Sequence, residues 1–153
     1  MADTAEKLEA EINIKSDPDE FFHSFGGKAH QLPNLCSEKL HAIDLHEGDW
    51  KTEGSVKHWT YVTDGKVETV KERFKVDEEN RIVTLEAIEG DIKEQYKSYK
   101  AELQVISKGV SNFAHWSIEY ETIKENDPAP TKYLHWLIHA AKDVDASLLK
   151  ARK

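Results

Sequence analysis

Apolar and polar side chains alternate strictly near the start of the chain. Every second position from Leu8 to Ile14 is apolar, and the positions between them carry charged or amide side chains. A period of two predicts a β-strand with one buried face. The strand ends at a polar stretch in which Ser16 or Asp17 can cap a helix, and Pro18 suits the first helical turn.

Two short helices and six further strands are expected next. The first helix carries Phe22 and Phe25 and stops at Gly26-Gly27, and the second covers residues 28–35 with a bend near Pro33. The strand-like runs that follow cover residues 39–46, 55–63, 67–76, 81–88, 95–106 and 112–123. Short polar turns join these runs, which favours an antiparallel meander.

The phase of each strand predicts which side chains share a face. In residues 39–46 plain alternation places Leu40 and Ile43 on opposite faces. In the last strand the same rule places Trp116 and Ile118 together. A sheet of seven strands tends to twist and curl, so its apolar face is expected to be concave.

The period changes at the C-terminus, where a helix is predicted. It runs from about Thr131 to Lys150 and is roughly 30 Å long at ~1.5 Å per residue. Its apolar arc, which includes Leu137 and Val144, is wide enough to suit a helix seated in a curved sheet. The pattern predicts the α+β class, with one domain over residues 1–153.

Charge and cysteine content narrow the classes of function. The chain has 21 Lys and Arg against 29 Asp and Glu, a formal net charge of −8, which disfavours a general binder of nucleic acid or anionic membranes. Cys36 is the single cysteine, so no intramolecular disulfide can form, and we expect it to be a small buried side chain. The charged N-terminus predicts no signal peptide, and no long apolar run could span a membrane. We therefore expect a cytoplasmic protein.

Polar side chains offer few candidate reactive sites. His135 and His139 share a helix face but lack a third metal ligand, so solvated histidines are expected and no metal. Glu72 and Glu86 each lie in mid-strand, and Asp145 borders the apolar arc of the last helix. A carboxylate that faces inward could anchor a ligand or act as a general base, although a solvated carboxylate is the ordinary interpretation.

Aromatic side chains are the more informative set. They recur along the strands and the first helix, and any one of them is most simply explained as core. As a group facing one long helix, they are also typical of the wall of a small-molecule pocket.

Several motifs resemble those of the plant major latex protein-like family. The chain carries Asp44-Leu45-His46-Glu47-Gly48-Asp49-Trp50, then Gly54-Ser55-Val56-Lys57-His58-Trp59, Glu89-Gly90-Asp91, Tyr96-Lys97-Ser98-Tyr99-Lys100 and Trp116-Ser117-Ile118-Glu119-Tyr120-Glu121. The resemblance covers about residues 6–149 in order. This family is a branch of the birch-pollen-allergen superfamily, also called pathogenesis-related class 10.

The resemblance implies a helix-grip fold. This is a curved seven-stranded antiparallel sheet with two short helices and a long C-terminal helix that together enclose a cavity. It also implies binding of hydrophobic or amphipathic small molecules such as lipids, sterols, hormones or phenolics, in connection with plant defence or stress. The superfamily's glycine-rich loop is replaced here by residues 48–54, so inferences from that loop are not carried over.

We therefore expect an intracellular carrier or sensor that encloses an apolar ligand between sheet and helix, with no catalytic residue, metal or cofactor. The side chains expected to form the wall are Trp59, Tyr61, Val83, Leu85, Tyr99, Leu103, Trp116 and Ile118. Those expected to form the lid and floor are Phe22, Phe25, Leu137 and Val144. Apolar burial would drive the affinity, and Tyr61 or Glu72 would fix the orientation of the ligand.

Two alternatives remain open. Some relatives are enzymes of secondary metabolism, an isomerase or cyclase of alkaloid type, that use an inward lysine and carboxylates on the later strands. The inward positions expected here contain neither a lysine nor an acid; they are Val83, Leu85 and Ala87, then Tyr99, Ala101, Leu103 and Val105. The second alternative is an interaction module whose protein partner binds near Glu47–Gly54. The oligomeric state is not defined by the sequence.

Overall fold

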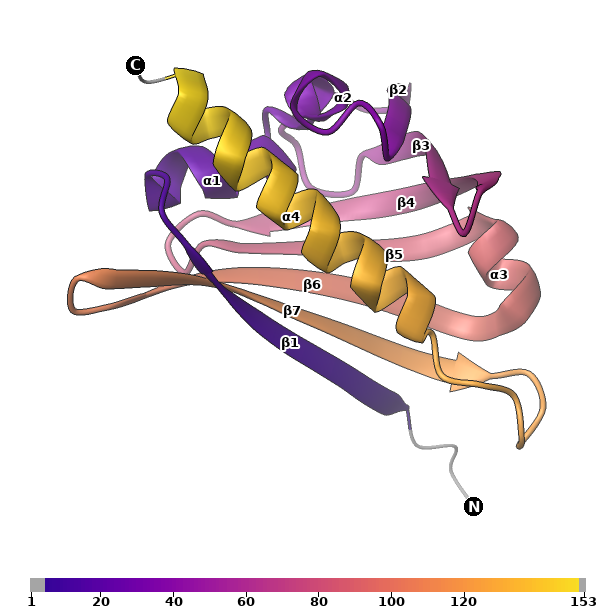
Figure 1. Ribbon diagram of the computed structural model, residues 1–153. Helices are drawn as coiled ribbons and strands as arrows, with labels where there is room; N and C mark the ends of the chain where they lie inside the picture. Colours follow the sequence, from indigo (N-terminus) through magenta and orange to yellow (C-terminus); the bar gives the residue numbers. More distant parts are fainter. Residues whose placement is uncertain (1–4, 152–153) are drawn as a thin grey trace.

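Seven strands form one antiparallel sheet in the computed structural model, which describes residues 5–151 (Figure 1). The strands are β1 (Glu6–Ile14), β2 (Leu40–Glu47), β3 (Val56–Thr63), β4 (Lys66–Asp77), β5 (Ile82–Gly90), β6 (Tyr96–Lys108) and β7 (Ser111–Thr122). Their order across the sheet is β1-β7-β6-β5-β4-β3-β2. The last six strands therefore form the meander that the short turns predict, and β1 pairs with β7 at one edge.

The helices lie on one side of this sheet. They are α1 (Pro18–Phe25), a single turn η1 (Ala29–Gln31), α2 (Leu32–Leu35), α3 (Asp91–Gln95) and α4 (Thr131–Ala151). In Figure 1, α4 crosses the sheet diagonally, with α1 and α2 beside its C-terminal half and α3 near its first turn. The helix-grip arrangement and the α+β class are confirmed, and no helix within residues 5–151 is long and apolar enough to cross a membrane. Residues 1–4, on which the signal-peptide expectation partly rests, lie outside the described residues.

Strand phases agree with the sequence prediction in most of the sheet. Val83, Leu85 and Ala87 on β5 are buried, as are the alternating side chains from Tyr99 to Val105 on β6. Trp116 and Ile118 are buried together on β7. The inner face of the later strands is therefore apolar, as expected.

The prediction for β2 was wrong. The β2–β3 register shifts between Leu40 and Ala42, and this irregularity turns both Leu40 and Ile43 inward, with exposed fractions of 0% and 8%. A bulge adds one residue to one strand of a pair and thereby reverses the alternation that follows it. The short helix α3 was not predicted, because a single helical turn of five residues is too short to show a helical period.

The corner between β1 and α1 is tied to the last helix. Asp17 caps α1 by accepting a hydrogen bond of 3.1 Å from the Glu20 amide. Ser16, the other candidate cap, instead donates its hydroxyl to the Asp145 carboxylate of α4. The same carboxylate accepts from the backbone amides of Lys15 at 3.0 Å and Ser16 at 2.8 Å. Asp145 therefore holds the C-terminal half of α4 against the corner.

Removing this carboxylate should destabilise the fold. The Asp145→Ala variant is expected to lose about 2 kcal/mol of unfolding free energy, because the Ser16 amide and hydroxyl lose their acceptor in a part-buried site. Urea denaturation measures the loss. The control is Asp143→Ala on the same helix, which breaks only a half-exposed ion pair with Lys39, and such pairs contribute ~0–1 kcal/mol. Equal losses in the two variants would contradict the anchoring role.

Candidate ligand-binding cavity

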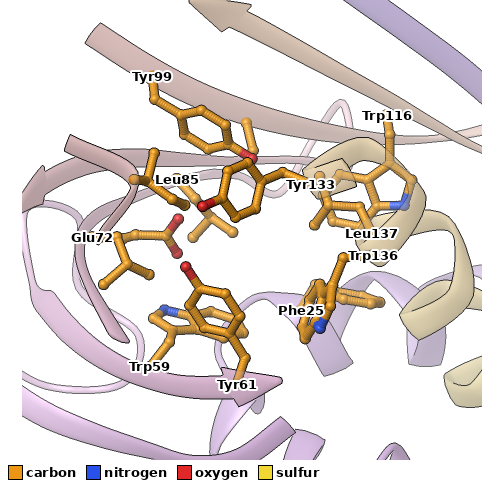
Figure 2. Close-up of a pocket in the computed structure, with 13 residues that line it drawn as sticks. Phe25, Trp59, Tyr61, Glu72, Leu85, Tyr99, Trp116, Tyr133, Trp136 and Leu137 are labelled. Carbon is orange, nitrogen blue, oxygen red and sulfur yellow. The ribbon is translucent and has the colours of Figure 1, made fainter. Parts of the chain in front are cut away.

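A cavity lies between the inner face of the sheet and α4. Thirteen side chains line it: Phe25, Trp59, Tyr61, Val70, Glu72, Leu85, Ile92, Tyr99, Ala101, Trp116, Tyr133, Trp136 and Leu137. They come from α1, α3, α4 and five central strands, β3 to β7. Figure 2 shows these side chains converging on a common space, with the Glu72 carboxylate directed into it.

Aromatic rings make most of the wall and hold one another in place. Phe25 and Trp116 pack edge to face with centroids 5.2 Å apart. Tyr133 of α4 packs in the same way on Tyr99 of β6, at 5.9 Å. Edge-to-face pairs of this kind stabilise a fixed ring orientation by ~0.5–1.5 kcal/mol beyond the area they bury. The wall is therefore apolar, and its rings support one another in this conformation.

The cavity is narrow in this conformation. The space open to the centre of a water-sized molecule is about 40 Å³. One water needs about 10–15 Å³ by this measure, so the space corresponds to a few waters. A larger apolar ligand therefore does not fit until the wall or α4 moves.

Eight of the predicted site residues line the cavity: Phe25, Trp59, Tyr61, Glu72, Leu85, Tyr99, Trp116 and Leu137. The other five, Phe22, Val83, Leu103, Ile118 and Val144, are fully buried but lie outside its lining. Val83 pairs with Leu103 across β5 and β6, and α1 packs against these strands and fills that end of the core. Inward direction alone does not separate packed core from cavity lining, so the sequence could not place these five outside the lining. A ligand-binding role for all thirteen residues stays a prediction.

Five lining residues were not named as site residues: Val70, Ile92, Ala101, Tyr133 and Trp136. Ile92 lies on α3, a helix that the sequence pattern does not predict. Tyr133 is part of the apolar arc of the last helix, and Trp136 follows three residues later on the same side. This three-residue spacing is the sequence pattern from which both aromatic residues of α4 could have been assigned to the cavity.

A buried carboxylate links three elements at one end of the cavity. Glu68 of β4 is 8% exposed and accepts hydrogen bonds from the hydroxyls of Tyr61, at 2.9 Å, and Tyr133, at 2.7 Å. Gln95 of α3 donates to the Tyr133 hydroxyl at 2.8 Å. Lys132 lies 3.4 Å from the second Glu68 oxygen. Burial and the nearby Glu68 carboxylate raise the pKa of both tyrosines well above the ordinary value, so both hydroxyls remain hydrogen-bond donors.

Glu72 is the polar group most directly exposed to the cavity. It is 6% exposed, and its carboxyl makes no hydrogen bond or ion pair within residues 5–151. Burial raises the pKa of this carboxyl to about 8, and the positive charge of Lys57 opposes the rise. Glu72 is therefore largely protonated at neutral pH and presents an O–H group.

Lys57 lies opposite Glu72 in the β3–β4 register and was not anticipated as an inward residue. Its side chain is buried, and its ammonium donates to the Trp50 carbonyl at 3.0 Å and lies 3.6 Å from the centroid of the Phe74 ring. Burial lowers the pKa of Lys57 to about 8. Lys57 therefore joins the loop after β2 to the sheet rather than lining the cavity.

Two indole nitrogens of the cavity wall have no acceptor. Trp59 and Trp116 are 4% and 1% exposed, and within the described residues their Nε1 atoms are buried without a hydrogen-bond partner. By contrast, Trp136 donates to the Val62 carbonyl at 2.9 Å. Buried donors in folded proteins nearly always have a partner, so these two enclosed N–H groups are exceptions.

The other polar candidates lie away from the cavity. Glu86 is exposed on the outer face of β5, and His135 and His139 are exposed on α4, as expected for solvated histidines. Cys36 is buried, as expected, and burial raises the pKa of its thiol to about 11. In the loop of residues 48–54, the Asp49 carboxylate accepts a hydrogen bond of 2.7 Å from the Thr52 amide. This carboxylate is therefore used within the loop itself.

The family model described as "Pathogenesis-related protein Bet v 1 family" matches residues 3–151. Among curated proteins, MLP-like protein 34 of Arabidopsis thaliana is 40% identical, with 95% of this chain and 47% of the relative covered. MLP-like protein 31 of the same plant is 37% identical, with 94% and 85% covered. The chain thus spans less than half the length of MLP-like proteins 34 and 28, at 47% and 44%, but most of MLP-like protein 31.

Solved structures agree with these matches. The crystal structure of ginseng major latex-like protein 151 from Panax ginseng has a TM-score of 0.93 at 37% identity, with 95% of this chain and 99% of that chain covered. Norcoclaurine synthase from Thalictrum flavum, at 22% identity and a TM-score of 0.75, shares the fold alone. The fold is one that supports hydrophobic ligand binding. Sequence, fold and cavity together show that this chain belongs to the Bet v 1 family and is similar to its major latex protein-like members.

Proposed function

We propose that this protein is an intracellular carrier or sensor of an apolar small molecule, which it holds between the sheet and α4. The observation that carries the proposal is a cavity with seven aromatic side chains in its wall and the Glu72 carboxyl directed into it. Apolar burial contributes ~25 cal/mol per Å² to binding, and a few polar groups set the ligand's orientation. A lipid, sterol, hormone or phenolic, and a role in plant defence or stress, are the finer parts of this proposal.

Binding of a polarity-sensitive apolar dye tests the proposal. A saturable fluorescence increase is expected, and unlabelled sterols or lipids should compete for the same site. Ala101 lines the cavity, whereas its neighbour Glu102 faces the outer side of the sheet. Ala101→Phe should weaken dye binding about tenfold or more by filling the space, and Glu102→Phe should not. Equal affinities in the two variants would place the dye outside the cavity.

An enzyme of secondary metabolism is the second candidate. The observation in its favour is Glu72, a buried carboxyl that faces the cavity with its pKa raised to about 8, which suits a general acid or base near neutral pH. Lys57, the inward lysine, is directed to the Trp50 carbonyl instead. Mass-spectrometric detection of turnover of an alkaloid precursor, abolished in Glu72→Gln, would favour this candidate. A protein partner at Glu47–Gly54 stays a prediction.

A further inference from the structure

All five tyrosines of the chain are buried, and their rings form one continuous series. The series begins at Tyr61, whose ring centroid lies 6.5 Å from that of Tyr133. The following centroid distances are 5.9 Å from Tyr133 to Tyr99, 6.5 Å from Tyr99 to Tyr96 and 5.8 Å from Tyr96 to Tyr120. Aromatic rings at such distances pack against one another. An electron can therefore pass from each ring of this tyrosine series to the next.

The tyrosine series runs from the cavity wall to an edge of the sheet. Figure 2 shows three of its members in the wall, namely Tyr61, Tyr99 and Tyr133. Trp136, a half-buried residue that also lines the cavity, packs on Tyr61 with centroids 5.7 Å apart. At the other end, the hydroxyl of Tyr120 on β7 donates to the exposed Glu6 of the edge strand β1. The rings thus connect the cavity with the molecular surface.

Proton acceptors lie at both ends of the tyrosine series. A tyrosine gives up an electron readily only when its hydroxyl proton leaves at the same time, because the protonated radical is a very strong acid. Glu68 accepts hydrogen bonds from Tyr61 at 2.9 Å and from Tyr133 at 2.7 Å. Glu6 accepts from Tyr120 at 2.8 Å. A carboxylate is therefore in place to take the proton at each end.

The two middle tyrosines lack such an acceptor. Tyr96 donates to the carbonyl oxygen of Pro128 at 2.9 Å, which is a very weak base. The Tyr99 hydroxyl makes no hydrogen bond within the described residues. The middle rings therefore conduct the electron, whereas a radical comes to rest at one end or the other.

Packing alone does not account for a series made only of tyrosines. A phenylalanine ring would fill the same space without a buried hydroxyl, and burying a hydroxyl costs free energy unless it is hydrogen-bonded. The chain has five phenylalanines, and within residues 5–151 none of them makes a ring contact with a tyrosine. Oxidisable rings thus follow one another from the cavity to the surface without interruption.

We propose that this protein has a further activity, in which the tyrosine series carries single oxidising equivalents from the cavity to the surface. A one-electron oxidant in the cavity, such as an excited quinone, becomes its semiquinone anion by taking an electron from Tyr133, whose proton moves to Glu68. Tyr120 then supplies an electron through the middle rings. Its own proton moves to Glu6, and the proton on Glu68 returns to Tyr133. Ascorbate at the surface restores the electron to Tyr120, and Glu6 returns the proton.

Pulse radiolysis of the full chain at neutral pH tests the proposal without any ligand. Azide radicals oxidise accessible indoles such as Trp136, which yields azide ion, an indolyl radical and a proton. Tyr61 should then reduce this radical: its proton moves to Glu68, and the indole nitrogen takes a proton from water. The expected result is a first-order decay of indolyl absorbance matched by a rise of tyrosyl absorbance, at a rate independent of protein concentration. A tyrosyl signal that is absent, or that rises only by collision between molecules, would overturn the proposal.

Conservative variants assign the steps to residues. Trp136→Phe should abolish the first-order phase, whereas Trp50→Phe, which removes an indole that packs on His30, should retain it. Glu68→Gln keeps an oxygen acceptor for both tyrosines but is a far weaker base, so the transfer should be about tenfold slower or more. A rate unchanged in Glu68→Gln would contradict the assignment of the proton acceptor.

Tyr120→Phe tests the exit at the surface. The first transfer should proceed as in the wild type, but ascorbate should quench the tyrosyl radical about tenfold more slowly, because the radical then stays at the buried Tyr61 or Tyr133. Equal quenching in the two proteins would contradict an exit at Tyr120. The proposed ligand-binding function is tested by dye titration and this activity by radiolysis, so either can fail while the other stands.

Discussion

Replacing Gly90 with alanine is expected to cost about 3 kcal/mol or more of unfolding free energy. Gly90 ends β5 with φ of +124°, a conformation that side chains other than hydrogen rarely allow. A Cβ there would lie 2.4 Å from the Thr69 carbonyl oxygen and 2.7 Å from the Val70 Cα. Both are backbone atoms of β4, so relief requires the two strands to separate, and Val70 lines the cavity. The variant should therefore lose stability and dye binding together.

Gly109 provides the matched control for this prediction. It has φ of +65° in the turn between β6 and β7, and a Cβ there would meet no atom within 4 Å. Gly109→Ala carries only the conformational cost, ~1–2 kcal/mol. Urea denaturation of the two variants separates backbone strain from steric overlap. Similar losses would show that the close approach of Gly90 to β4 is unimportant.

The protein is expected to become less stable as the pH rises from about 5 to 8. The Glu72→Gln variant should lose much less stability over the same range. The folded-state pKa of Glu72 is raised from 4.5 to about 8. Between these values the folded state binds more protons than the unfolded state, so stability is fully present below 4.5 and is lost as the pH approaches 8. The loss is on the order of a few kcal/mol, at ~1.4 kcal/mol per unit of pKa.

Lys57 has the opposite effect on stability, at a higher pH than Glu72. Its pKa is lowered from 10.5 to about 8, so its burial penalty disappears as the pH rises through that range. Together the two residues should give a stability minimum near pH 8. Urea unfolding of the wild type and Glu72→Gln across the range measures this. Parallel stability profiles would contradict an inward, protonated Glu72.

The sequence predicts most of the fold because its strands alternate cleanly. On β6 and β7, apolar residues occupy the inward phase almost without exception, so period alone identifies the buried face. On β3 and β4 the inward phase contains Lys57, Glu68 and Glu72, side chains that ordinarily mark a solvated face. Their burial depends on pairing between strands, which a single sequence does not display. Glu72 was distinguished by its mid-strand position, whereas Lys57 and Glu68 were missed.

The extent of the cavity is harder to predict than its wall. Phe22 and Phe25 lie three residues apart on α1 and both are buried, yet only Phe25 lines the cavity. The difference depends on where α1 meets the sheet and on side-chain rotamers. Bulges, such as the one after Leu40, move side chains to the other face without a clear sequence signal. The cavity volume is the small difference between the volume that the fold encloses and the volume that its side chains fill. A change in one side-chain rotamer is therefore enough to open or close the cavity.

The last helix is attached at both ends, which limits how the cavity can grow. Asp145 holds its C-terminal half to the β1–α1 corner, while Tyr133 and Trp136 bond its first turns to Glu68 and Val62. A ligand that lifted the helix would break bonds at one end or both, whereas ring rotation leaves the Asp145 attachment intact. We therefore expect capacity to depend on rotation of the aromatic rings, which favours thin, planar ligands over thick ones. Affinity within a homologous series should level off with ligand thickness before it levels off with length.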